Sequence, residues 1–363
     1  MKRNTLRTSA SAAALLSLSL VLGACGAGNE DGGDSGSGSL SGTLNGAGAS
    51  SQQAVVAAWK AAFQTENSDA TVNYDPVGSG GGREQFLSGG VDFAGSDAYL
   101  DDEELAAAQE RCGGDIIEVP VYVSPIAVAF NLEGVDELNL SAQTIGAIFE
   151  GTITAWNDPA IVADNPNVDL PSDAIIPVHR SDDSGTTKNF TAYLEETSGG
   201  SWTAGEVETW PTPEGESAQG TAGVIDRVKA TANSITYADA SQAGDLSTAA
   251  VKVGDDFTEY SPEAAAAILE KSAPVEGRGE TDLAIAVDRA TEEAGVYPVV
   301  LVSYAIACQT YDDGAKADLV KGWMSYLVSS EGQEKAAADA GAAPIGGDIA
   351  EKAQAAVETI SAS

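Results

Sequence analysis

The sequence predicts an α/β protein whose chain forms two lobes. From Leu40 onward, short apolar runs typical of buried strands alternate with segments of helical periodicity, which is the signature of this class. Two extended β-rich segments, 118–131 and 296–308, lie far apart in the chain and contain prolines. We expect these two segments to pair as crossover strands that join the lobes.

The individual elements follow from local patterns. Val55, Trp59 and Phe63 recur every four residues and form the apolar stripe of a helix. The segment 99–110 carries acidic residues in its first turn, where the helix dipole favours negative charge, so we interpret them as capping residues and not as metal ligands. We expect strands at 41–48, 71–79, 91–97 and 174–180, and helices at 50–64, 80–90 and 99–110. The later elements are a helix that runs into a loop around Trp156 at 144–158, a loop at 199–220, a helix followed by a strand at 222–240, and helices at 315–340.

The N-terminus predicts export. Lys2, Arg3 and Arg7 precede the apolar stretch 10–24, which is too short to span a bilayer as a stable anchor and reads as a signal peptide, residues 1–24. It ends in "LGAC", which resembles the lipobox of bacterial lipoproteins. Lipidation of Cys25 would anchor the protein to the outer face of the cell membrane; the alternative is an ordinary signal peptide with a chance cysteine.

A flexible linker and an acidic globular part follow. Residues 25–39 are mostly Gly, Ser and acid, without apolar periodicity. The remainder is long enough for one large domain or two lobes. The chain carries a formal net charge of −37, so nucleic acid and anionic lipid are excluded as expected partners. Solubility, or a salty habitat, explains the charge.

Besides Cys25, the chain has two cysteines, Cys112 and Cys308. In an exported protein this even remainder favours one disulfide, with two buried free thiols as the alternative. The sequence contains no C-x-x-C or H-E-x-x-H spacing, so we expect no metal site.

Three glycine-rich turns each lie between an expected strand and an expected helix, at 46–51, 77–82 and 181–187. Backbone N–H groups at a helix N-terminus lack partners within the helix, and the dipole there favours an anion. Glycine permits close approach, and Ser or Thr adds a hydroxyl donor. With Arg180 just before the third turn, the set predicts a cradle for a compact tetrahedral anion.

A catalytic serine is the competing interpretation. The stretch "VGSGG" lacks the glycine two positions before the serine that a nucleophile elbow requires, and no P-loop motif occurs. His179, the only histidine, alternates in strand phase with Arg180, so it points away from a cleft that Arg180 faces. We therefore expect a plain strand residue and no enzyme.

Four stretches carry a family resemblance: "LNGAGASSQQAVVAAWKAAFQ", "VGSGGGREQFLSGGVDFAGSDAYL", "FEGTITAWNDPAIVADNPNVDLP" and "HRSDDSGTTKNFTAYL". From Leu40 onward the chain resembles the phosphate-binding proteins of bacterial ABC phosphate uptake systems. The resemblance implies a two-lobed periplasmic-binding-protein fold of type II, with two hinge strands and a cleft. It places lobe I at 40–130 plus 304–363 and lobe II at 131–303. It also implies a monomer without cofactor that delivers inorganic phosphate to a membrane permease.

The resemblance also assigns roles to individual residues. Asp97 would accept the phosphate proton, Arg180 would be the charge partner, and Asp182 would orient Arg180. The remaining donors would come from the three turns: Ser50, Ser51, Ser79, Ser184, Gly185 and Thr186. Ser51 and Gly80 depart from the family, which often has a bulky apolar residue and a second hydroxyl residue there; we expect tuned affinity.

Asp97 distinguishes phosphate from other oxyanions. A carboxylate repels an anion unless a proton lies between them, and near neutral pH phosphate keeps an O–H whereas sulfate has none. A receptor for sulfate or molybdate is the first alternative, in which Asp97 would have no useful role. A secreted serine hydrolase or phosphatase is the second, and it would need a base near Ser79 or Ser184.

Overall fold

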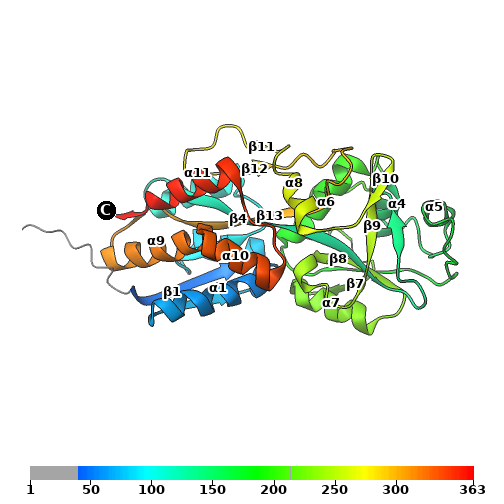
Figure 1. Ribbon diagram of the computed structural model, residues 1–363, viewed down its shortest axis with the longest axis horizontal. Helices are drawn as coiled ribbons and strands as arrows, with labels where there is room; N and C mark the ends of the chain where they lie inside the picture. Colours follow the sequence, from blue (N-terminus) through cyan, green and yellow to red (C-terminus); the bar gives the residue numbers. More distant parts are fainter. Residues whose placement is uncertain (1–39, 213) are drawn as a thin grey trace, which may run out of the picture. The chain divides into compact units, whose positions relative to one another are not determined.

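The computed structural model describes residues 40–212 and 214–363. The leader, Cys25 and the linker therefore lie outside the described residues. Most strands belong to one sheet of eleven, in which β2-β1-β3-β13-β4-β8-β6-β7 are neighbours in that order. Strand β9 pairs with β4, and β5 and β10 pair with β9. Figure 1 labels β9 and β10 at the end of the molecule opposite β1.

One end of this sheet and its helices form what we call lobe I. Strands β1 and β2 are parallel, and β3 pairs with the other side of β1. In Figure 1, α1, α9 and α10 lie together beside β1. Lobe I comprises β1 (Ser41–Gly48), α1 (Gln53–Glu66), β2 (Asp69–Asp75), α2 (Ser79–Leu87), β3 (Phe93–Ser96), α3 (Asp102–Cys112), β14 (Thr310–Tyr311), α9 (Gly314–Val328), α10 (Ser330–Ala340), α11 (Gly347–Glu358) and β15 (Ser361–Ala362).

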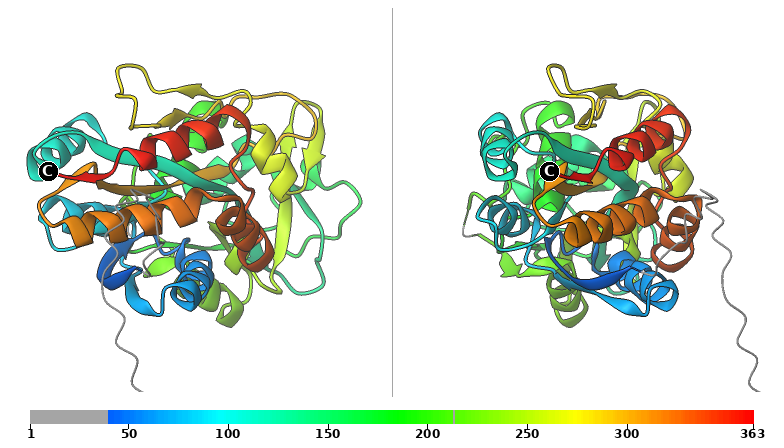
Figure 2. Two further views of the ribbon diagram at one scale, coloured as in Figure 1. Left: turned by 60° about the vertical axis from the view of Figure 1, so that its left-hand side comes forward. Right: turned by 90° about the vertical axis from the view of Figure 1, so that its left-hand side faces the viewer.

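The other end forms lobe II, drawn in green and yellow in Figures 1 and 2. Strand β6 pairs in parallel with both β7 and β8. Lobe II comprises β5 (Leu138–Leu140), α4 (Ala142–Phe149), α5 (Pro159–Asp164), β6 (Ile176–Arg180), α6 (Gly185–Thr197), β7 (Glu216–Ala218), α7 (Gly220–Ala230), β8 (Ser234–Asp239), the 3-10 helix η1 (Ala240–Gln242), β9 (Ser247–Val253), β10 (Asp256–Thr258) and α8 (Pro262–Ala267). The short pair β11 (Ala273–Pro274) and β12 (Ile285–Ala286) lies in the strap between α8 and β13.

Two long strands connect the lobes. Strand β4 (Ile116–Asn131) pairs antiparallel with β13 (Val300–Cys308) over its first part and with β8 over its last. Pro120 faces a register shift between Ser303 and Tyr304, and Pro125 lies where β4 changes partner, so the missing N–H of each proline falls where the ladder is irregular. The predicted pairing of the two long segments is confirmed.

Most of the other expected elements form near their predicted positions. Helix α1 buries Val55, Trp59 and Phe63, and the Trp59 indole N–H donates to the Gly332 carbonyl at 2.7 Å. Asp101 caps α3 by accepting from the Glu104 N–H, as the acidic first turn predicts. Among the additions, β7 lies within the segment expected to be loop, and β9, β10, α8 and α11 were not anticipated. The lobe boundaries at 130/131 and 303/304 stay predictions.

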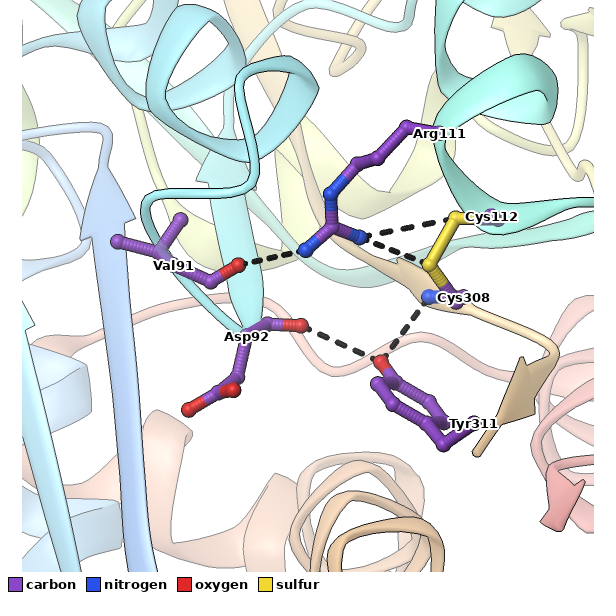
Figure 3. Close-up of a disulfide and its surroundings, with 6 residues drawn as sticks. All are labelled: Val91, Asp92, Arg111, Cys112, Cys308 and Tyr311. Carbon is purple, nitrogen blue, oxygen red and sulfur yellow. Dashed lines mark hydrogen bonds between the residues drawn. A yellow bond between two sulfur atoms is a disulfide. The ribbon is translucent and has the colours of Figure 1, made fainter. Parts of the chain in front are cut away.

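The two remaining cysteines form a disulfide. Cys112, the last residue of α3, and Cys308, the last of β13, lie with their Cα atoms 5.3 Å apart. Figure 3 shows Arg111 beside the bridge, where its guanidinium lies 2.8 Å from the Cys308 sulfur and donates to the Val91 carbonyl at 2.8 Å. The bridge lies entirely within lobe I and its hinge strand.

We predict that reduction destabilises this lobe. The bridge closes a loop of 196 residues, which restricts the unfolded chain, so Cys112→Ala/Cys308→Ala should lower the free energy of unfolding by about 2–4 kcal/mol. Urea unfolding measures the change. Reductant should shift the wild-type midpoint to that of the double variant and leave the variant unchanged. A wild-type midpoint that reductant does not move would contradict the prediction.

A buried acidic residue, Asp239, lies at the end of β8. The Asp239 side chain is 1% exposed; Oδ1 accepts from the Ser241 N–H at 2.9 Å and from the Ser241 hydroxyl, while Oδ2 has no hydrogen-bond partner. Burial raises the pKa of Asp239 to about 7, against the opposing effect of the hydrogen bonds from Ser241, and the nearby Asp97 charge raises it further.

This carboxyl should make stability depend on pH. Its folded pKa lies above its unfolded value, so between about pH 4 and pH 7 the native state holds a proton that the unfolded chain has released, and the unfolding free energy falls as pH rises. Asp239→Asn should remove a decrease of up to about 4 kcal/mol across this window. Urea unfolding at pH 5 to 8 measures the slope, with the exposed Asp256→Asn as control. Parallel slopes for wild type and Asp239→Asn would refute the assignment.

Candidate functional site

The three glycine-rich turns meet where the two lobes touch. Turns 46–51 and 77–82 belong to lobe I and follow β1 and β2, and turn 181–187 follows β6 of lobe II. Hydrogen bonds between turns cross the junction, including Gly80 N–H to the Asp183 carbonyl at 3.3 Å. The structure therefore brings the three turns together, together with Asp97, which follows β3.

In the first turn, Ser50 and Ser51 are both buried. The Ser50 hydroxyl lies 3.1 Å from that of Thr221 and accepts from the Thr221 N–H at 3.0 Å. The Ser51 hydroxyl donates to Asp97 Oδ2 at 2.6 Å. Gln242 of lobe II donates to the Ser50 carbonyl at 2.9 Å. One serine thus contacts the opposite lobe and the other contacts the acid.

Asp97 lies at the centre of the junction and is 2% exposed. Besides the Ser51 hydroxyl, Oδ2 accepts from the Thr186 hydroxyl of lobe II at 3.2 Å, and Oδ1 accepts from Ser303 of β13 at 2.8 Å. Burial raises the pKa of Asp97, while these hydroxyls and the Arg180 charge oppose the rise. The side chain is thus surrounded by donors, which suits a carboxylate that acts as an acceptor.

The orientation of the Ser303 hydroxyl is fixed from behind. Gln52 Nε2 donates to the Ser303 oxygen at 2.7 Å and to the Tyr304 carbonyl at 3.0 Å. Since an amide N–H₂ can only donate, the Ser303 proton is directed to Asp97. The backbone of Asp97 is also held: its N–H donates to the Ser79 hydroxyl at 3.0 Å, and its carbonyl accepts from Asn189 at 2.6 Å.

The second and third turns are in direct contact. Ser79 begins α2 after Gly78, which has a φ of 102° and so favours glycine. A Cβ at Gly185 would lie 2.5 Å from the Ser79 hydroxyl and 2.8 Å from the Asp97 Cβ. Gly185 thus allows the lobes to approach this closely. A Cβ at Gly80 would lie 2.6 Å from that of Asp183, which accounts for glycine at this position.

Helix α6 presents its N-terminus to this junction. Ser184 caps the helix, and its hydroxyl accepts from the Thr187 N–H at 3.1 Å. Gly185 and Thr186 are the first two helical residues, whose N–H groups have no acceptor within the helix. The helix dipole therefore directs partial positive charge toward Asp97 and the turns of lobe I.

Arg180 supplies a full positive charge at the end of β6 and is 3% exposed. Its Nε donates to Asp182 Oδ1 at 2.8 Å, and its Nη2 donates to Asp182 Oδ2 at 2.5 Å. Asp182 also accepts from the Gly220 N–H at 3.0 Å. Burial acts to raise the pKa of Asp182, but the hydrogen bonds and charge of Arg180 lower it overall. The pair holds the guanidinium in one orientation.

His179 takes no part in this arrangement. Its Nδ1 lies 3.0 Å from the Arg180 carbonyl oxygen, and its ring stacks on Trp210 at a centroid distance of 4.9 Å. Burial lowers the pKa of His179. No hydrogen bond joins His179 to a serine among residues 40–212 and 214–363, and within the same ranges no cluster of His, Cys, Asp or Glu could hold a metal.

Several residues at the junction escaped the sequence reasoning. Thr221 follows Gly220, which has a φ of 72° and begins α7, so the two residues form a fourth turn at a helix N-terminus like the three predicted ones. Ser303 and Gln52 gave no local signal, because a single polar residue within an apolar strand or helix face is common. The Tyr237 hydroxyl lies 2.7 Å from the Thr187 hydroxyl and so forms a hydrogen bond with the first turn of α6.

The arrangement can bind a small anion that carries a proton. It combines hydroxyl and N–H donors, a helix N-terminus and a guanidinium with one buried carboxylate acceptor. The roles of the individual residues remain predictions.

No helix of the described residues is long and apolar enough to cross a bilayer.

The proteins that this chain resembles in sequence include several phosphate-binding proteins. Residues 33–331 match the PBP superfamily domain. The chain is 36% identical over 313 residues to phosphate-binding protein PstS 3 of Mycobacterium leprae, covering 84% of this chain and 83% of that protein. It is 34% identical over 345 residues to phosphate-binding protein PstS 2 of Mycobacterium tuberculosis, covering 90% and 92%.

Solved structures agree on the fold. A high-affinity periplasmic phosphate-binding protein with bound phosphate, PfluDING, gives a TM-score of 0.71 at 23% identity over 86% of this chain and 93% of that one. The phosphate-binding protein of Stenotrophomonas maltophilia gives 0.67 at 19% identity over 87% and 94%. The predicted α/β periplasmic-binding-protein fold with two lobes is confirmed, and the chain belongs to the PstS family of phosphate-binding proteins.

Proposed function

We propose that this protein binds inorganic phosphate between its lobes, outside the cytoplasm, and delivers it to a membrane ABC permease. The observation that carries the proposal is the environment of Asp97, a 2% exposed carboxylate surrounded by donors at the meeting point of three anion-binding turns. The donors would be Ser50, Ser51, Ser79, Arg180, Ser184, Gly185 and Thr186, with Asp182 orienting Arg180.

The presence of an acceptor among donors favours a protonated oxyanion. Phosphate near neutral pH keeps at least one O–H, which can donate to Asp97 Oδ1 or Oδ2. Sulfate has no proton and would place like charges in contact in a buried site, where such contacts are costly. Molybdate as the dianion meets the same penalty. We therefore favour phosphate over these oxyanions.

Catalysis is not part of the proposal. A serine nucleophile needs a base within hydrogen-bond reach, and the partners of Ser79 and Ser184 in the structure are the N–H groups of Asp97 and Thr187. The relatives named above are binding proteins as well. The ligand would leave unchanged, without a cofactor.

We further propose that the mature protein is a monomer held at the outer face of the cell membrane by lipid on Cys25. The leader 1–24 and the linker 25–39 would then export and tether the globular part. Hinge strands β4 and β13 would allow the lobes to close on phosphate and open for release. Edman sequencing and mass spectrometry of the exported protein would test the lipid.

The function is tested by ligand titration. We expect the purified protein to bind phosphate with a Kd on the order of micromolar or lower, and to bind sulfate at least about 100-fold more weakly, because only phosphate offers Asp97 a proton. Isothermal calorimetry with phosphate, arsenate, sulfate and molybdate measures this. Sulfate affinity equal to that for phosphate would reject the proposal.

Asp97→Asn should alter selectivity. An amide can donate to a ligand oxygen, so we expect sulfate binding to strengthen relative to phosphate by about tenfold or more, which is the equivalent of about 1.4 kcal/mol. Competition titrations of the variant with both anions give the ratio. The nearby Asp92→Asn, which removes an acid outside the junction, should leave it unchanged. An unaltered ratio in Asp97→Asn would remove Asp97 from the site.

A further inference from the structure

A second buried charge lies beside the anion site, at Arg83 of α2. Its side chain is 4% exposed and all its hydrogen bonds are to side chains. Nε donates to both oxygens of Glu104 at 2.9 and 3.0 Å, Nη1 donates to Ser96 at 3.0 Å, and Nη2 donates to Glu208 at 2.6 Å. None of these four residues was singled out as part of the anion cradle.

The four residues do not belong to one lobe. Arg83, Glu104 and Ser96 lie on α2, α3 and β3 of lobe I, whereas Glu208 lies on the loop between α6 and β7 of lobe II. The Arg83–Glu208 contact is therefore an ion pair between the lobes. The same loop also reaches the cradle, since the Glu208 carbonyl accepts from the Ser184 N–H at 3.2 Å.

The contact differs in kind from a surface ion pair. The Glu208 side chain is 19% exposed, and its Oε1 atom is buried without a hydrogen-bond partner and lies 3.9 Å from Lys188 Nζ. Burial acts to lower the pKa of Arg83, but the charges of Glu208 and Glu104 raise it overall. Away from water the attraction between the two charges is stronger but is offset by the cost of their desolvation, whereas the loss of one partner leaves an unpaired buried charge, which is strongly unfavourable.

The Arg83–Glu208 ion pair forms only when the two lobes are close, because Arg83 has partners in its own lobe and Glu208 has no hydrogen-bonded cation in its own. Within lobe I alone, Arg83 still has Glu104 and Ser96, so its charge remains compensated when the lobes separate. Glu208 has only Lys188 in its own lobe, at a distance beyond a hydrogen bond. Contact with Arg83 is thus available to Glu208 only when the lobes are together.

We propose that Arg83 and Glu208 form a latch that holds the lobes together and sets the rate at which the anion leaves. This rests on the proposed function for the identity of the anion, but the latch itself acts on the lobes. Glu208 and Ser184 belong to the same lobe and are joined by a hydrogen bond. When the lobes close, the latch and the third turn therefore approach lobe I in one movement. Arg83 and Glu208 act as positioning residues and do not contact the ligand.

The test compares two acids of one loop. Glu208→Gln removes the latch charge, and Glu206→Gln removes the same charge two residues away, where the side chain is 44% exposed and 3.6 Å from Lys188. By stopped-flow fluorescence, Glu208→Gln should release phosphate at least about tenfold faster, with an association rate within about threefold of wild type. Glu206→Gln should match wild type in both rates.

Hydrogen exchange of the ligand-free protein supplies a readout without phosphate. Across the lobe junction, the Gly80 N–H bonds to the Asp183 carbonyl and the Thr221 N–H bonds to the Ser50 hydroxyl. These bonds form only in the closed arrangement, so both N–H groups should exchange faster in Glu208→Gln than in Glu206→Gln. Arg83→Lys, which keeps the charge but loses the forked geometry, should show an intermediate change in both assays and serves if Glu208→Gln folds poorly.

Equal release rates and equal exchange in the two glutamine variants would overturn the latch. If wild type bound neither phosphate nor another oxyanion, the proposed function would fail, and exchange in the ligand-free protein would alone decide whether the latch exists. Faster exchange confined to Glu208→Gln would then support it, and equal exchange would reject it.

Discussion

The structure depends on the burial of one carboxylate at the place where two lobes meet. Asp97 is held by hydroxyls from the turn before α1, from α6 and from β13, so three parts of the chain that are far apart in sequence converge on it. Burying a charge this deeply is costly unless donors surround it, and the donors here come from both lobes. Lobe closure and the stabilisation of the buried Asp97 charge are therefore coupled, because the Thr186 hydroxyl of lobe II reaches the acid only when the lobes are in contact.

The acidity of the protein does not conflict with an anion site. Of the acidic residues that the structure describes, four are buried, namely Asp97, Glu118, Asp239 and Asp282; the others are at least partly exposed to solvent, where salt screens their charges. The site depends on short-range effects: helix N-termini, hydroxyls and the Arg180 guanidinium fixed by Asp182. Arg83 adds a further cation at the lobe junction, and its two carboxylate partners keep it from presenting free positive charge to the ligand.

Sequence reasoning succeeded where the signal was local or repeated. Helical spacing located α1, and the glycine-rich turns located the cradle, because a turn between strand and helix has a characteristic composition. It failed where the signal is purely three-dimensional. Ser303 is one polar residue in an apolar strand, and nothing in the sequence says that its hydroxyl points at Asp97. Glu208 was placed in a Gly/Pro/acid-rich loop, where an isolated acid normally has no partner, yet it reaches Arg83 more than a hundred residues away. The acidic turn at 101–104 was correctly interpreted as a cap, but Glu104 has a second role that capping does not suggest.

Strand β4 carries a consequence for how the family can vary. It is continuous from Ile116 to Asn131, pairs with β13 in its first part and with β8 in its last, and is buried along nearly its whole length. Because side chains alternate between faces, inserting or deleting one residue near Pro125 would turn the rest of the strand over and misalign it with β8. The connection between the lobes is therefore intolerant of length changes, whereas the surface loops can lengthen or shorten freely. Related chains should therefore differ in length in their surface loops, whereas the number of residues in the strand that connects the two lobes should stay the same.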